Sequence, residues 1–161
     1  MAATLLVHLL LVVVGASAVA ASLLLAALAF LVRPRAVKIP INGRRVLVTG
    51  GSSGIGLAVA RQAAAQGARV AILARDLQKL EEAREEIRRA TGAEVDVYGA
   101  DVRDEGAVRR AVEAAGPVDV LVCSHGVLWS REVGAQDMDM EEVKHTIDVN
   151  LVGTFHLIKA A

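Results

Sequence analysis

Hydrophobic and polar positions divide the chain into two regions that suit different solvents. The first 32 residues contain no Lys, Arg, Asp or Glu, and residues 5–31 are almost entirely Leu, Val, Ala and Phe. A helix rises about 1.5 Å per residue, so this run would reach roughly 40 Å, more than the roughly 30 Å hydrocarbon core of a bilayer. The pattern predicts a transmembrane anchor over residues 1–32.

From residue 41 onward, short β-branched runs alternate with longer amphipathic stretches. Strands are predicted at 45–49, 70–74, 94–98 and 118–124, and helices at 55–66, 77–90, 105–115 and from 141 to the C-terminus. Strands that alternate with helices of this length pair in parallel through right-handed crossovers. We therefore predict a doubly wound, Rossmann-like α/β sheet, of which residues 41–161 contain the first four strands.

Residues 33–40 are predicted to be an extended tether, because two prolines disfavour a continuous helix. Basic residues follow the apolar run in this tether and at Arg44 and Arg45, whereas none precedes it. Positive charge marks the cytoplasmic side of a span, so we expect a single-pass anchor with the folded region in the cytosol. A cleaved signal peptide is the alternative, because Ala16-Ser17-Ala18 resembles a cleavage site. The missing basic start and the apolar sequence beyond that site favour the anchor.

Charge and cysteine content narrow the classes further. The 18 basic and 18 acidic residues are interspersed and the net charge is zero, so no nucleic-acid partner is predicted. The single cysteine, Cys123, excludes an internal disulfide and fits a reducing compartment. No metal site is predicted.

A glycine-rich turn, TGGSSGIG at residues 49–56, joins the first predicted strand to the first helix. Gly50 would let the chain leave the strand sharply, Gly54 would let the backbone approach a pyrophosphate, and Gly56 would let the helix pack closely. The start of the helix would present unpaired N–H groups to the phosphates. Such a cluster alone could be a flexible loop, but its place between a strand and a helix favours a dinucleotide site.

The end of the second predicted strand indicates which dinucleotide is bound. A carboxylate there binds the ribose 2′-hydroxyl of NAD, whereas an arginine suits the 2′-phosphate of NADP. The chain has Arg75 there and Lys79 one helical turn later, which favours NADP(H). Asp76 is predicted to be the N-cap of the following helix rather than a ribose ligand. For Lys79, a solvated helix charge is an equal alternative.

Three motifs carry a resemblance to a known family. The turn at residues 49–56, Ala100-Asp101-Val102, and Asn150-Leu151-Val152-Gly153 resemble those of the short-chain dehydrogenase/reductase superfamily. Together with the anchor and tether, they look like its 3-dehydrosphinganine reductase branch, particularly the plant type. The resemblance implies NADPH-dependent reduction of a long-chain sphingoid ketone at the endoplasmic reticulum membrane. Reduction of a steroid or retinoid by another anchored member of the superfamily stays open.

The resemblance also implies roles for individual residues. The cofactor-binding residues would be Gly50, Ser52, Ser53, Gly54, Gly56, Arg75, Lys79, Asp101, Val102 and Gly126. Asp101 would bind the adenine amine, Gly126 would pass the nicotinamide ribose, and the backbone of the catalytic Asn150 would support a proton-relay water. Residues 123–126 read Cys-Ser-His-Gly where the family often has Asn-Asn-Ala-Gly. His125 replaces the alanine and is interpreted as incidental.

The Tyr-x-x-x-Lys motif of that family does not occur in these 161 residues. Its lysine lowers the pKa of the tyrosine, so that the phenol can protonate a ketone oxygen. The one tyrosine, Tyr98, falls on the third predicted strand, with Val102 four positions later. We expect a partial domain that is inactive by itself, either as a fragment of a reductase or as a short nucleotide-binding protein. Its open sheet edge and the apolar positions 151, 155 and 158 predict a homo-oligomer or a completing partner.

Overall fold

The computed structural model describes residues 1–32, 40–128 and 139–161. Two compact units divide the chain, Met1–Ile39 and Pro40–Ala161. The division falls at the end of the predicted tether, most of which lies outside the described residues.

The first unit contains one helix, α1 (Ala2–Leu31). Its segment Thr4–Leu31 has a mean hydropathy of 2.6 and is long and apolar enough to cross a membrane. The serine hydroxyls in it donate to the helix backbone, Ser17 Oγ to Val13 O and Ser22 Oγ to Ala18 O, both at 2.9 Å. These bonds satisfy the hydroxyls without water, which suits an apolar medium.

The second unit is built on a four-stranded parallel sheet. Its strands are β1 (Arg45–Thr49), β2 (Arg69–Ala74), β3 (Val95–Gly99) and β4 (Val120–Cys123). Their order is β3-β2-β1-β4, and every neighbouring pair is parallel. The predicted doubly wound sheet is confirmed, although β4 is shorter than predicted. Because the chain moves outward from β1 to β3 and then returns to β4, the switch point lies between β1 and β4.

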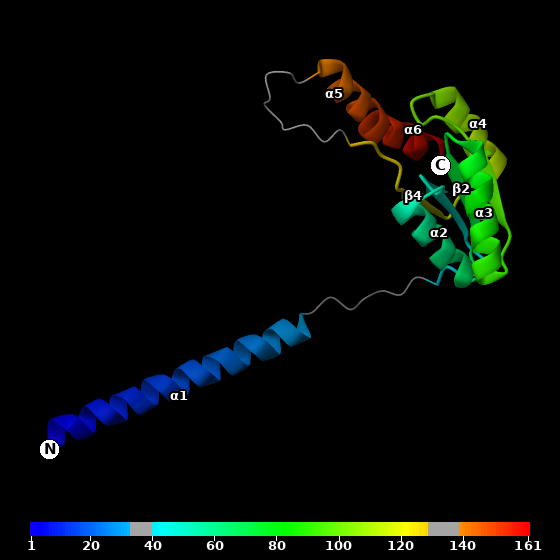
Figure 1. Ribbon diagram of the computed structural model, residues 1–161. Coiled ribbons are helices and arrows are strands. Elements are labelled where there is room, and N and C mark those ends of the chain that lie inside the picture. Colours follow the sequence, from blue (N-terminus) through cyan, green and yellow to red (C-terminus); the bar gives the residue numbers. More distant parts are fainter. Residues whose placement is uncertain (33–39, 129–138) are drawn as a thin grey trace. The chain divides into compact units, whose positions relative to one another are not determined.

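Helices cover both faces of this sheet (Figure 1). On one face, α2 (Gly54–Ala65) and α3 (Leu77–Thr91) pack on Val46, Val48 and Ile72. On the other, α4 (Glu105–Ala115) and the C-terminal helix α6 (Gly153–Ala160) pack on Leu47, Ala71 and Leu73. Successive strand residues point to opposite faces, so the continuous apolar run of β1 supplies both cores.

The predicted helical region from residue 141 to the C-terminus is confirmed, but it is not a regular α-helix throughout. It comprises α5 (Met140–Ile147), a π-helical turn η1 (Asp148–Val152) and α6. The N–H of Gly153 donates to Asp148 O, five residues back. One extra residue in a turn rotates the following helix, so Val149 and Leu157, eight positions apart, are both buried in the same core.

Candidate cofactor-binding site

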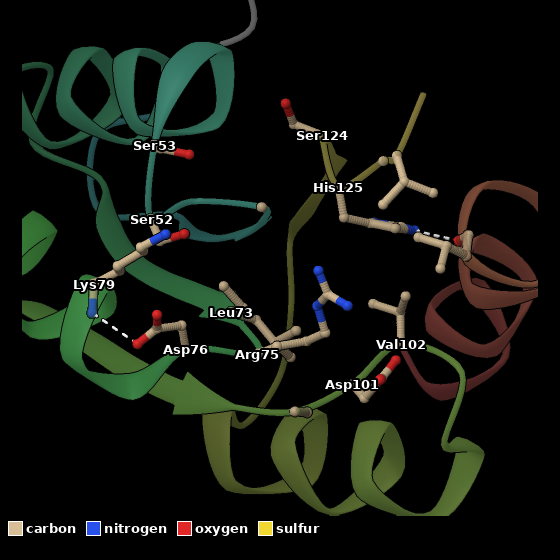
Figure 2. A pocket seen from close by; sticks show the side chains of 16 residues that line it. Ser52, Ser53, Leu73, Arg75, Asp76, Lys79, Asp101, Val102, Ser124 and His125 are labelled. Carbon is tan, nitrogen blue, oxygen red and sulfur yellow. Dashed lines mark hydrogen bonds between the residues drawn. The ribbon is translucent and has the colours of Figure 1, made fainter. Parts of the chain in front are cut away.

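A cleft of about 290 Å³ lies along the carboxyl ends of the strands (Figure 2). Each strand is followed directly by residues that line it, which is the usual place for a ligand in an open α/β sheet. Among the predicted cofactor-binding residues, the cleft brings together Gly50, Ser52, Ser53, Arg75, Lys79, Asp101, Val102 and Gly126. Gly54, Gly56 and Asn150 do not line the cleft.

The turn after β1 contains three glycines, at positions 50, 54 and 56, that are each required for a separate reason. Gly50 has φ +68°, and a Cβ on it would lie 2.6 Å from Ser124 O and 2.8 Å from His125 Cα. A Cβ on Gly56 would collide with the carbonyl of Gly50, so α2 could not approach the turn with any side chain there. Gly54 has φ +57° and no neighbour within 4 Å, so its backbone is open to an approaching group. Glycine is therefore required at each position, for conformation, for contact or for both.

The start of α2 differs from the starts of α3, α4 and α5. Asp76, Asp104 and Asp139 accept backbone N–H bonds at the starts of α3, α4 and α5. Ser53, the N-cap of α2, makes no such side-chain bond among the described residues, and the first turn holds no acid. The first amides of α2 and the positive end of its dipole therefore suit an anion such as a phosphate.

The two acidic residues of the cleft, Asp76 and Asp101, both accept hydrogen bonds from nearby groups. Asp76 Oδ1 accepts from the Lys79 N–H at 3.2 Å, so its predicted N-cap role is confirmed. Asp101 is bound by Arg103, with Nη2 to Oδ2 at 2.6 Å. The hydrogen bond from Arg103 lowers the pKa of Asp101 to about 2, and the charge of Arg75 adds to the effect. Both acids therefore have partners close to them in the sequence.

The two cations of the cleft, Arg75 and Lys79, form no ion pair within the described residues. Figure 2 shows the Arg75 side chain extending from the end of β2 into the cleft, with Lys79 nearer to Ser52. Unpaired cations facing a cleft are available to an anionic ligand.

Asn150 lies in η1, directly behind the cleft wall that follows β4. Its Oδ1 accepts from Val127 N and its Nδ2 donates to Val127 O, both at 2.8 Å. A Cβ on Gly126 would lie 3.3 Å from Asn150 Oδ1, so glycine is favoured there. The Asn150 carbonyl accepts from Thr154 Oγ1 at 2.8 Å. The predicted role of that carbonyl stays a prediction.

Two contributors to the site were missed by the sequence analysis. Arg103 fixes Asp101, and the Asp-x-Arg spacing could have indicated it. His125, interpreted above as incidental, lines the cleft. Its Nδ1 lies 2.7 Å from Thr49 Oγ1 and its Nε2 lies 3.2 Å from Val149 O, while burial lowers its pKa. No local pattern could have indicated these partners, because they are distant in the sequence.

Tyr98 lies on β3, as predicted, and does not line the cleft. Its hydroxyl donates to Ala114 O of α4 at 3.1 Å, and burial raises the pKa of the phenol. This tyrosine is therefore a packing residue between β3 and α4.

The fold and the cleft together define a class. A parallel doubly wound sheet with a glycine-rich turn, an uncapped helix start and a cleft at the switch point is a dinucleotide-binding domain. Residues 44–161 match the family model described as short chain dehydrogenase. The chain belongs to the short chain dehydrogenase family, whose members bind a nicotinamide cofactor.

Three curated relatives of the chain are named 3-dehydrosphinganine reductase. The chain is 56% identical over 131 residues to 3-dehydrosphinganine reductase TSC10A of Arabidopsis thaliana, covering 81% of this chain and 40% of the relative. It is 54% identical over 138 residues to TSC10B of the same plant, covering 86% and 41%. A 3-dehydrosphinganine reductase of Danio rerio is 34% identical over 158 residues, covering 93% and 46%. The chain thus spans less than half the length of these relatives.

Solved structures show the same fold. A short-chain type dehydrogenase/reductase from Mycobacterium marinum matches with a TM-score of 0.70 at 33% identity, covering 75% of this chain and 49% of that one. One from Mycobacterium ulcerans matches with a TM-score of 0.69 at 34% identity, covering 76% and 46%.

Proposed function

We propose that this chain is the NADPH-binding part of a membrane-anchored 3-dehydrosphinganine reductase of sphingolipid synthesis. One observation carries the choice of cofactor: Arg75 and Lys79 face the cleft without ion pairs, while Asp76 and Asp101 already have partners. A 2′-phosphate would find two cations without ion pairs there, and the carboxylate of Asp76, which would otherwise bind a ribose hydroxyl, already accepts a hydrogen bond from the helix start.

The residues present fit a dinucleotide. The open amides at the start of α2, with Ser52 and Ser53, would hold the pyrophosphate. Arg75 and Lys79 would hold the 2′-phosphate, and Asp101 would accept from the adenine amine. Gly126 would allow close approach of the nicotinamide ribose. NADPH, when bound, supplies the hydride for reduction of a ketone carbon.

The substrate and the location rest on other observations. The high identity to two plant proteins named 3-dehydrosphinganine reductase supports a long-chain sphingoid ketone as the substrate. The apolar helix α1 supports anchoring in a membrane, where such a lipid would reside. Basic residues only on the C-terminal side of α1 support a cytosolic second unit, and we place the protein at the endoplasmic reticulum.

The cofactor proposal is tested by binding NADPH and NADH to the whole chain in lipid nanodiscs. NADPH should bind more tightly, and Arg75→Ala should weaken NADPH about tenfold to a hundredfold, the effect of a charge-assisted hydrogen bond, with NADH little changed. Arg109→Ala, which removes an exposed arginine of α4 away from the cleft, is the matched control. Equal affinity of the unmodified chain for NADPH and NADH would overturn the proposal.

The substrate proposal needs a catalytic half as well. A chimera would join this chain to the remainder of the Arabidopsis relative TSC10A, of which it spans 40%. NADPH oxidation by the chimera should be fast with 3-dehydrosphinganine and slow with a steroid ketone or retinal. A preference for either of the latter would contradict the assignment.

A further inference from the structure

We propose that His125 is a positioning residue, whose imidazole joins the buried end of β1 to η1 and thereby fixes the cleft wall formed by residues 124–127. Its effect on cofactor binding rests on the proposed function above. The link itself rests on hydrogen bonds and burial alone.

The first half of the link is the hydroxyl of Thr49. Thr49 is the only polar residue in the buried class within the described ranges, with 0% of its surface exposed. A hydroxyl removed from water needs a partner, and His125 Nδ1 lies 2.7 Å away, compared with 3.4 Å for Val122 O. The imidazole is therefore the main partner of this hydroxyl. When Thr49 donates, Nδ1 accepts and the ring proton lies on Nε2.

The second half of the link is the other ring nitrogen. Nε2 lies 3.2 Å from Val149 O and 3.4 Å from Thr154 Oγ1. The Thr154 hydroxyl already donates to Asn150 O, so its oxygen can accept from Nε2–H. A neutral imidazole with one acceptor and one donor satisfies both sides, and the lowered pKa that burial gives His125 agrees with that form. His125 thus connects a strand with helical residues 100 and more positions further along the chain.

The link fixes a wall of the cleft. His125 contacts the glycine turn through its backbone, because Gly50 leaves no room for a Cβ between them. Two residues later, Val127 is held by both polar atoms of the Asn150 side chain. Gly126, which lines the cleft, lies between these two attachments. An apolar side chain at position 125 could fill the space, but it would leave the Thr49 hydroxyl without its main partner.

Three substitutions separate bonding from packing. His125→Leu keeps most of the volume and removes both bonds, while His125→Gln retains an acceptor and a donor. Thr49→Val removes the β1 partner with little change in shape. All are made in the whole chain in nanodiscs, and amide hydrogen exchange of residues 124–127 and 148–154 is followed without cofactor.

The exchange rates of both segments should rise roughly tenfold in His125→Leu and in Thr49→Val, as expected for the loss of one buried hydrogen bond. In His125→Gln, they should stay within about twofold of those of the unmodified chain. Unchanged exchange in His125→Leu, or no rescue by glutamine, would overturn the proposal. If His125→Leu does not fold, the conservative pair Thr49→Val and Thr49→Ser gives the same comparison.

Ligand binding distinguishes positioning from general loosening. His125→Leu should weaken NADPH roughly tenfold more than 2′-phospho-ADP, which lacks the nicotinamide riboside. Equal weakening of both ligands would overturn the positioning role. If the unmodified chain binds neither ligand, the proposed function fails, whereas the exchange measurements still decide whether His125 forms the link.

Discussion

The carboxylate of Asp76 accepts a hydrogen bond from the backbone N–H of Lys79 at 3.2 Å, and so begins α3. The preceding residue, Arg75, extends instead into the cleft (Figure 2). Both residues line the cleft, but the carboxylate of Asp76 is bonded to the start of the helix, whereas Arg75 forms no ion pair within the described residues. A negative charge turned to the helix start is also stabilised by the helix dipole.

This relationship predicts the effect of Asp76→Ala. Loss of the N-cap should lower the free energy of unfolding by about 1 kcal/mol, as measured by urea denaturation, and Asp76→Ser should restore most of it. Binding of NADPH should be kept or strengthened, because a negative charge is removed from the cleft. Asp104→Ala, which removes the equivalent bond to Ala107 N at the start of α4, should cost the same stability without affecting binding. A selective loss of NADH binding in Asp76→Ala would instead make Asp76 a ribose ligand.

Gly54 and Gly92 offer a matched pair of substitutions. Both have positive φ, +57° and +73°, and neither would bring a Cβ within 4 Å of another atom. Alanine at either position should cost about 1 kcal/mol of folding free energy through backbone strain alone. Only Gly54 lies at the open start of α2, so only Gly54→Ala should also weaken NADPH, by at least about tenfold. Equal binding by the two variants would remove Gly54 from the site.

The Asp101–Arg103 pair predicts a pH dependence. The pKa of Asp101 is lowered from 3.8 to about 2 in the folded chain, chiefly by the bond from Arg103. A depressed pKa adds stability above the unfolded value, and this stability is lost as pH falls through the folded value. Arg103→Ala should therefore unfold more easily than the unmodified chain near neutral pH, and the difference should shrink between about pH 4 and pH 2. A difference that stays constant down to pH 2 would show that Arg103 acts through contacts other than Asp101.

Structural features that depend on residues close together in the sequence could be predicted, and features that depend on residues far apart in the sequence could not. The glycine turn, the four strands and the Asp76 cap were all predictable, because each depends on a few consecutive residues. The π-helical turn η1 was not predictable, because the position of α6 depends on the contact between Gly153 and the distant Val102. A Cβ on Gly153 would lie 2.6 Å from Val102 Cγ2. The partners of His125 lie 76 and 24 positions away, so they follow only from the arrangement of the sheet and the helices.

A lysine introduced at position 155 or at position 157 of α6 should have different effects on association and folding. Phe155 is 62% exposed, and Leu151 and Ile158 are also exposed, whereas Leu157 is 0% exposed. Exposed apolar patches promote association, so Phe155→Lys should reduce concentration-dependent self-association without lowering the melting temperature. Leu157→Lys buries a charge without a partner and should prevent cooperative folding. Sedimentation velocity in detergent and thermal unfolding check the pair, and unaltered association of Phe155→Lys would exclude this face as the interface.

Tyr98 provides a direct test of what these 161 residues can do alone. It is the one phenol in the sequence, and its hydroxyl donates to Ala114 O between β3 and α4. Tyr98→Phe should therefore cost up to about 1 kcal/mol of stability, the usual net worth of such a bond, and leave NADPH binding unchanged. With no phenol at the cleft to protonate a ketone, the chain should bind NADPH and yet not oxidise it when 3-dehydrosphinganine is added. NADPH oxidation at 340 nm checks this, with the TSC10A chimera as the positive control. Turnover by the 161 residues that Tyr98→Phe abolished would mean that Tyr98 reaches the substrate, in conflict with its position on β3.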